Sequence, residues 1–210
     1  MSYYQGMNYI VVFLYKIFQG NKNLTFKFFY FLTKNYLIKY FTKDFKGLIK
    51  LIFLCDKLMQ ICNGIVWKKL EASEVSTIHF GVPCLITIYT TLLKIQDFNS
   101  LYLISEIWDL FLAQGYRSLI KSILYCLELQ QSHILDVDPD NLFLAMKDLE
   151  KDPMSVMKFK KVENRAIIDS YLFINKEHIN DFEIDPKTFE RLCAHYERIH
   201  KPILKFWSEE

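Results

Sequence analysis

Residues 7–18 read MNYIVVFLYKIF, and this stretch decides the class of fold. Its apolar side chains recur at intervals of three and four residues, which is the period of one helix face. Those on this face are Met7, Ile10, Val11, Leu14, Ile17 and Phe18. Tyr9, Val12 and Phe13 fill the opposite side. Since a helix that is apolar all round is normally buried, we predict a central, buried helix over residues 7–18.

The same helical period continues along the chain, and no stretch alternates cleanly between apolar and polar residues. It predicts further helices over residues 26–40, 45–62, 66–72, 101–111, 119–127, 139–150, 163–174 and 186–200. One more helix is expected to carry Pro83 in its first turn, where a missing N–H costs nothing. The fold class that follows is all-α, with many helices.

Two Asp-Pro pairs mark the starts of later helices. Asp138-Pro139 and Asp185-Pro186 fit an N-cap followed by the first helical position, because aspartate accepts from free helix N–H groups. On the helix over 45–62, the spacing of Cys55 and Cys62 places both thiols on the inner face. We interpret them as core residues and not as a redox pair.

The composition excludes several classes of protein. The chain has 210 residues, of which 51% are hydrophobic, so it can bury a sizeable core in one domain. A collagen-like or disordered chain would need fewer large apolar residues. Six glycines also argue against a glycine-rich nucleotide-binding fold.

Charge is spread unevenly along the chain. Residues 1–70 carry 11 lysines and two acids, a net charge of +9, whereas residues 71–210 carry a net charge of −7. This basic first third could contact an acidic partner or an anionic membrane surface. Nucleic acid is disfavoured as a partner, because phosphate recognition favours arginine and the chain has four arginines against 22 lysines.

The remaining signals favour an intracellular protein without a metal. Five cysteines without a CxxC pair and without a secretory signal indicate reduced thiols in the cytoplasm. The longest apolar stretches, such as Tyr9–Tyr15, are far too short to cross a membrane. The five histidines do not pair at the spacing of a zinc site. We expect no metal and no cofactor.

The residues before the first helix carry the functional signal. Gln5 and Gly6 form a short loop, from which the Gln5 amide can project and use both its donor and its acceptor on a partner, for instance to orient a water. The alternative is a plain capping turn, in which Gln5 is solvated and Gly6 allows the bend. The residues alone favour that alternative.

Three segments resemble the TBC domains, which are GTPase-activating domains for Rab-family GTPases. YYQGMNYI at residues 3–10 resembles the family motif YxQGMN. PCLITIY at residues 83–89 is similar to the segment W-L-L-T-L-F, with Cys84 where tryptophan is usual. IWDLF at residues 107–111, followed by Gly115, resembles I-W-D-x-(F/L)…G. The resemblance covers residues 2–135 and extends to about 150.

The resemblance implies a role for each matched residue. Gln5 would be the glutamine finger that positions the attacking water in place of the GTPase's own glutamine. Its neighbours Tyr3, Tyr4, Gly6 and Asn8 would contact the Rab partner, and GTP and Mg²⁺ would belong to that partner. Three later residues would be structural: Trp108 packs inward, Asp109 anchors a neighbouring loop, and Gly115 ends a helix.

The resemblance also implies an arginine finger that we expect to be missing from this chain. It would lie upstream of the YxQG motif, in I-x-x-D-x-x-R, and the motif here begins at the third residue. An arginine finger contributes about 10³–10⁵ in rate. We therefore expect a TBC-type domain over residues 1–150 without its N-terminal segment, and a helical extension over 151–210 that packs on the same domain.

Three hypotheses of function follow. The first is a Rab GTPase-activating domain fragment acting in vesicle trafficking, cytoplasmic or peripheral on endomembranes. The second is a catalytically inactive TBC-like module that binds a small GTPase. The third is a helical interaction scaffold in which the motifs serve folding alone.

Overall fold

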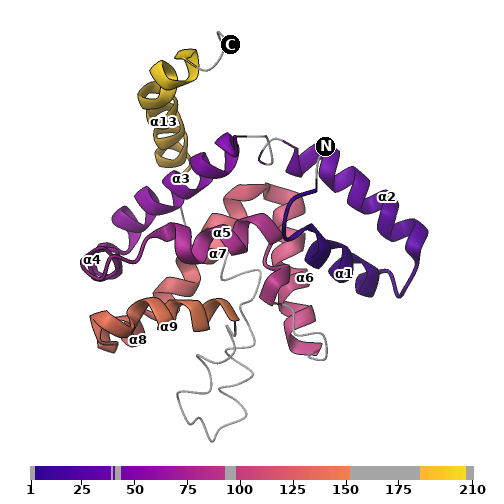
Figure 1. Cartoon of the computed structure of the whole chain (residues 1–210), viewed down its shortest axis with the longest axis horizontal. Helices are drawn as coiled ribbons and strands as arrows, with labels where there is room; N and C mark the ends of the chain where they lie inside the picture. The colour runs from indigo at the N-terminus through magenta and orange to yellow at the C-terminus, as the bar shows by residue number, and fades with distance from the viewer. Residues whose placement is uncertain (1–2, 39, 41–43, 93–97, 152–184, 207–210) are drawn as a thin grey trace, which may run out of the picture.

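The computed structural model describes residues 3–38, 40, 44–92, 98–151 and 185–206 (Figure 1). Within these ranges every regular element is a helix and there is no strand, which confirms the predicted all-α class. Helices α3, α5 and α7 pack against one another, and the views place α5 and α7 near the centre. The helix predicted over 163–174 lies outside the described residues.

The first two helices form an antiparallel pair at one side of the molecule (Figure 1). They are α1 (Met7–Ile17) and α2 (Lys22–Leu32), and a short π-helix, η1 (Thr33–Leu37), continues α2. Helix α2 begins earlier than the apolar pattern predicts, because the Asn21 side chain accepts from the backbone N–H of Leu24 at 3.1 Å.

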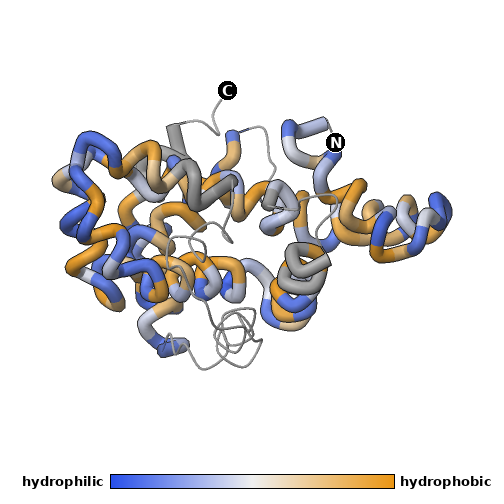
Figure 2. Tube along the Cα trace, turned by 90° about the horizontal axis from the view of Figure 1, so that it is seen from below, coloured by the Kyte–Doolittle hydropathy of each residue, from blue (hydrophilic) through white to orange (hydrophobic). Residues whose placement is uncertain are grey.

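The prediction that α1 is buried all round is wrong. Ile10, Phe13 and Leu14 are buried, but Tyr9 and Val12 on the other side are exposed. Apolar residues on every side of α1 therefore do not mean that the whole helix is buried. The described neighbours cover α1 on one side. The tube coloured by hydropathy shows apolar stretches running out along this end of the molecule (Figure 2).

Helices α3 (Lys46–Cys62) and α4 (Gly64–Ala72) lie on the other side of the core. The prediction that both cysteines of α3 are core residues is half wrong. Cys55 is fully buried, whereas Cys62 is exposed. The two cysteines stand seven residues apart on one face, but Cys62 is the last residue of the helix.

Helix α5 (Thr77–Thr87) corrects the prediction for Pro83. The helix begins six residues before Pro83, so the proline lies inside it and not in its first turn. The start is set by a capping box, in which Ser76 Oγ accepts from the N–H of Ile78 while His79 Nδ1 accepts from the N–H of Ser76. A short 3₁₀ turn, η2 (Thr90–Leu92), follows.

Within its described residues, the second half of the chain adds four helices to the core and one on its surface. They are α6 (Phe98–Gln114), α7 (Tyr116–Leu129), α8 (Gln131–Asp136), α9 (Pro139–Lys151) and α13 (Pro186–Phe206). Asp138 and Asp185 cap α9 and α13 as predicted, since each carboxylate accepts a backbone N–H of the first turn. None of the described helices combines the length and apolar content that a membrane crossing requires.

Helix α13 packs against α3. The ring centroids of Tyr196 and Phe53 lie 5.3 Å apart, and Lys50 Nζ lies 2.7 Å from a Glu197 carboxylate oxygen. This contact joins a helix of the last third of the chain to the first third. The division of the chain at residue 150 stays a prediction, because the residues around it lie largely outside the described ranges.

Candidate functional site

Residues 3–8, which we call the Gln5 loop, lead directly into α1. The N–H of Met7 donates to the carbonyl of Tyr4 at 3.2 Å, and the N–H of Tyr9 donates to the carbonyl of Gly6 at 3.1 Å. These bonds make a tight turn whose tip is Gln5. The Gln5 side chain is exposed, and it has no hydrogen-bond partner within the part of the chain that the structure describes.

Gly6 is required at its position for two separate reasons. Its φ of +106° lies in the region that side chains rarely adopt. A Cβ built on Gly6 would also lie 2.9 Å from Thr87 Cγ2 and 3.2 Å from Ile86 Cγ2. The loop backbone therefore rests directly on the C-terminal end of α5, and a side chain at Gly6 would lift it away.

The two flanks of the loop are also held. The Tyr3 hydroxyl donates to Asn8 Oδ1 at 3.3 Å, which ties the start of the loop to the first turn of α1. The ring of Tyr4 packs edge-on against Phe45, with centroids 5.4 Å apart. Gln5 is thus an uncommitted amide between two anchored neighbours.

A second layer of contacts lies beneath the loop and comes from Trp108 on α6. Its indole is buried and packs on Phe13 of α1, with ring centroids 4.7 Å apart. Its Nε1–H donates to the carbonyl of Ile88 at 2.9 Å, just beyond the end of α5. Trp108 therefore joins α1, which carries the Gln5 loop, to the chain segment that follows Thr87.

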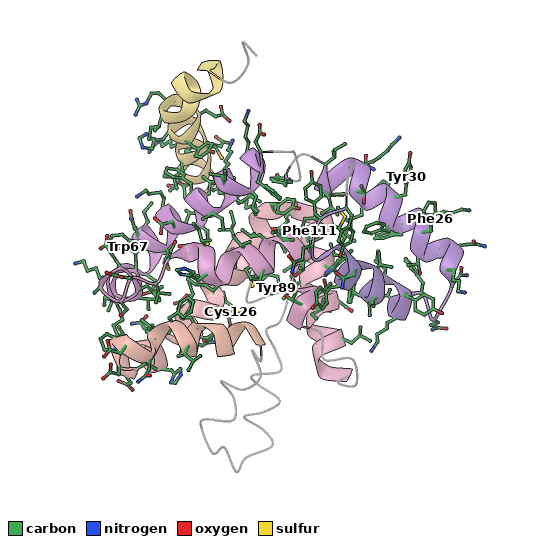
Figure 3. All side chains as sticks on the ribbon, viewed as in Figure 1. Phe26, Tyr30, Trp67, Tyr89, Phe111 and Cys126 are labelled. Atoms are coloured by element: carbon green, nitrogen blue, oxygen red, sulfur yellow. The ribbon has the colours of Figure 1, made fainter. Side chains whose placement is uncertain are left out.

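The three segments singled out in the sequence meet in this region. Residues 3–8 rest on Ile86 and Thr87 of the second segment, and Trp108 of the third bonds Ile88 of the second. Tyr89 is buried nearby, and burial raises its pKa well above the usual value. Figure 3 shows Tyr89 and Phe111 within the packed interior. Gly115 follows α6 with a φ of +69°.

Sequence reasoning assigned no role to Phe45, Ile86 or Thr87, which support the loop. Ile86 and Thr87 lie inside the segment PCLITIY at residues 83–89. Their residue types do not indicate contact with a glycine 80 residues earlier. Thr87 also has an internal role, because its Oγ1 donates to the carbonyl of Pro83 at 2.7 Å. Asp109 is exposed on α6, and its anchoring role stays a prediction.

The arginines that the structure describes lie on other elements. The Arg117 guanidinium on α7 stacks over the ring of Phe189, 5.5 Å from its centroid. Arg191 and Arg198 are exposed on α13, where Arg198 bonds His195 at 3.1 Å. In these contacts no arginine is committed to the Gln5 loop.

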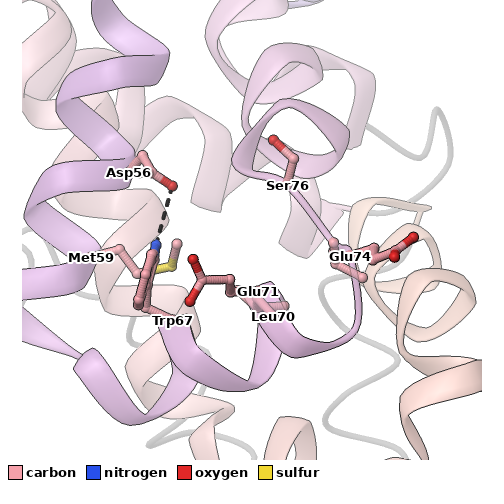
Figure 4. Close-up of a pocket in the computed structure, with 8 residues that line it drawn as sticks. Asp56, Met59, Trp67, Leu70, Glu71, Glu74 and Ser76 are labelled. Carbon is pink, nitrogen blue, oxygen red and sulfur yellow. Dashed lines mark hydrogen bonds between the residues drawn. The ribbon is translucent and has the colours of Figure 1, made fainter.

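A separate cavity of about 320 Å³ lies between α3 and α4 (Figure 4). Trp67 forms one wall, and its Nε1–H donates to Asp56 Oδ1 at 3.4 Å. Thr77 Oγ1 donates to the same oxygen at 3.1 Å. The residues lining this cavity do not include the Gln5 loop. No group of three potential metal ligands occurs among the described residues.

The chain matches the model of a known protein family. The family model described as the Rab-GTPase-TBC domain matches residues 1–135. This range begins with the Gln5 loop and includes α1–α7, so it contains all three segments that meet beneath Gln5. No curated protein matches the chain.

Proposed function

This chain belongs to the Rab-GTPase-TBC domain family, and we propose that it acts on a Rab-family small GTPase with Gln5 as its glutamine finger. In this proposal the Gln5 amide enters the nucleotide site of the GTPase and orients the water that attacks the γ-phosphate. GTP and Mg²⁺ are supplied by the partner. The chain contributes position and hydrogen bonding, which are the main sources of catalysis in phosphoryl transfer.

The observation that carries this proposal is the contrast between Gln5 and its neighbours. Tyr4 packs on Phe45, and Gly6 rests on Ile86 and Thr87, while the Gln5 amide is exposed and uncommitted. A catalytic amide must reach a partner and must also be held within a fraction of an ångström. The loop meets both needs, because its backbone is anchored on each side of the projecting side chain.

The electrostatics of the loop suit an anionic target. Helix α1 starts at Met7, its N-cap residue Gly6 provides no side-chain cap, and its first turn contains no acid. The positive end of the helix dipole therefore lies beside Gln5 without a compensating charge from its own side chains. Residues 1–43 contain six lysines and no acid. The sequence around the loop therefore adds positive charge to that of the helix N-terminus.

The test is single-turnover GTP hydrolysis by a panel of Rab GTPases. Gln5→Asn keeps the amide but shortens its reach by one methylene, and we expect it to lower the stimulated rate by about 10²-fold. Gln19→Asn is the matched control, because Gln19 lies just beyond the other end of α1, is also exposed, and has a positive φ that asparagine tolerates. Equal rates for the two variants would contradict the proposal.

A second candidate function is binding without stimulated hydrolysis. It is favoured by the placement of the arginines that the structure describes, Arg117 on α7 and Arg191 and Arg198 on α13, since an arginine finger supplies a large share of the rate in this class of reaction. Under this alternative the chain binds the GTP form of a Rab more tightly than the GDP form, and hydrolysis is unchanged. A scaffold role would instead give binding that does not depend on the nucleotide.

A further inference from the structure

The outer face of α2 combines exposed aromatic rings with lysines. Phe26 is 69% exposed and Tyr30 is 51% exposed, and their rings stack with centroids 6.4 Å apart. Lys34 Nζ lies 5.0 Å from the centroid of the Tyr30 ring. Residues 26, 30 and 34 are each four positions apart, so they form one row along α2 and η1.

A second row with the same character lies beside the first. Leu24 and Phe31 are 48% and 47% exposed, and Lys27 between them is exposed as well. The opposite side of α2 is turned inward, since Thr25 and Leu32 are buried. Figure 3 shows Phe26 and Tyr30 on α2 at the outer edge of the molecule. Each row thus mixes bulky apolar groups with a positive charge.

We propose that this face, made of Leu24, Phe26, Lys27, Tyr30, Phe31 and Lys34 with Lys22 at its N-terminal end, docks on an anionic membrane surface. The occupant is a lipid bilayer that contains acidic headgroups. The rings enter the boundary between headgroups and acyl chains, while the lysines reach the lipid phosphates. This docking does not depend on the proposed action on a GTPase.

The pattern of charge favours a membrane over a protein partner. Lysine is depleted in the centres of protein interfaces, where burying its ammonium is costly. Helices that lie in the membrane interface instead combine lysine with phenylalanine and leucine, because the long lysine stem can extend along the apolar layer to the headgroups. Residues 1–43 contain no Asp or Glu, so no acidic side chain from this stretch opposes an anionic surface.

The position of α2 makes the contact possible. Helix α2 lies at one side of the molecule, away from α4, α8 and α9 (Figure 1). Its inner side packs on α1, so the outer face can approach a flat surface without unfolding. The contact is peripheral, since α2 has 11 residues and lies on the membrane without crossing it.

The experiment is co-sedimentation of the full chain with vesicles. One set contains phosphatidylcholine with about one-third phosphatidylserine, and the other contains phosphatidylcholine alone. We expect the chain to bind the first set, to bind the second much less, and to dissociate as salt is raised from about 0.1 M to about 0.5 M. No binding to the acidic vesicles overturns the proposal.

Two variants separate the charged and apolar contributions. Changing Lys22, Lys27 and Lys34 to Gln should lower partitioning by about 10²-fold, since each lysine near an acidic surface contributes about five-fold. Changing all three to Arg should preserve binding. Phe26→Ser with Tyr30→Ser should lower it by about ten-fold or more, through loss of the inserted rings. Both side chains are exposed, so folding should be retained and is checked by circular dichroism.

The matched control changes Lys46, Lys68 and Lys187 to Gln, three exposed lysines on α3, α4 and α13. It removes the same charge from other surfaces and should reduce binding by less than about three-fold. An equal loss in the control would show that overall charge, and not this face, drives binding. Self-association that is abolished by the serine variant, with no vesicle binding, would assign the face to a second copy of the chain and overturn the proposal.

Discussion

The indole N–H of Trp108 donates to the carbonyl of Ile88 at 2.9 Å, across 20 residues of sequence. Ile88 itself has a φ of +51°, which is unusual for a β-branched residue. The strained turn is therefore held by a buried hydrogen bond. Because Trp108 also packs on Phe13, this one side chain connects the end of α5 to the helix that carries the Gln5 loop.

Trp108→Phe is expected to destabilise the chain by about 1–3 kcal/mol, because the Ile88 carbonyl loses its buried donor. Urea unfolding measures the change. The same variant should also weaken stimulated GTP hydrolysis, since α1 loses part of the surface on which it rests.

Trp67→Phe is the matched control for this change. Trp67 is only half-buried, and its bond to Asp56 is long at 3.4 Å. We expect the control to cost less than about 1 kcal/mol. If the two substitutions cost the same, the Trp108–Ile88 bond has no special part in stability.

Gly6→Ala tests the fit of the Gln5 loop on α5. The substitution combines strain from a positive φ with a Cβ placed 2.9 Å from Thr87 Cγ2, so the loop must move. We expect a loss of about 1–3 kcal/mol in stability, together with a drop in the Gln5-dependent rate. Thermal unfolding and the hydrolysis assay report the two effects.

Gly64→Ala provides the comparison. Gly64 is the first residue of α4 and has no positive φ, and a Cβ added to it would meet no atom within 4 Å. Alanine there should be neutral or stabilise the chain by up to about 1 kcal/mol. Equal destabilisation by the two alanines would mean that the close approach of Gly6 to α5 is not a constraint.

The helices themselves were predictable because each packs one apolar face on the core, and a period of three and four residues reports that face directly. The same period does not predict whether each apolar side chain on a face is covered by a neighbouring element. Tyr9 and Cys62 both follow the apolar pattern, yet both are exposed, because coverage depends on neighbours distant in sequence. Pro83 was misplaced because a proline fits a first turn, while the actual start is set by the cap at Ser76.

The candidate site was predictable only in its residue types. The pair Gln5-Gly6 indicates a bend with a projecting amide, and the resemblance implies the role that we propose for that amide. The support of that bend by Ile86, Thr87 and Phe45 arises from tertiary packing, for which a single sequence has no local signal.

Thiol labelling should distinguish Cys62 from Cys55. Cys62 is exposed at the end of α3, whereas Cys55 is fully buried. We expect a thiol reagent to modify Cys62 in the native chain and to reach Cys55 only after denaturant is added. Mass spectrometry of the digested protein identifies each site. Modification of both thiols at the same rate would show that α3 is not packed as described.

Stability should fall as the solution becomes alkaline, and Cys55 should contribute to the slope. Burial raises the pKa of the Cys55 thiol, and burial raises the pKa of Cys126 to about 12. In the unfolded chain a thiol loses its proton near pH 8.5, about its ordinary pKa. Above that pH the unfolded chain binds fewer protons than the folded chain, so the free energy of unfolding decreases.

Each such thiol should steepen the decline by up to about 1.4 kcal/mol per pH unit between its unfolded and folded pKa values. Cys55→Ala removes one of these contributions, so its stability should fall less steeply with pH than that of the natural chain. Cys62→Ala serves as the control, because Cys62 is exposed and should contribute less to the decline of the free energy of unfolding with pH. Urea unfolding at a series of pH values measures all three chains. If Cys55→Ala declines as steeply as the natural chain, the Cys55 thiol is not held protonated by burial.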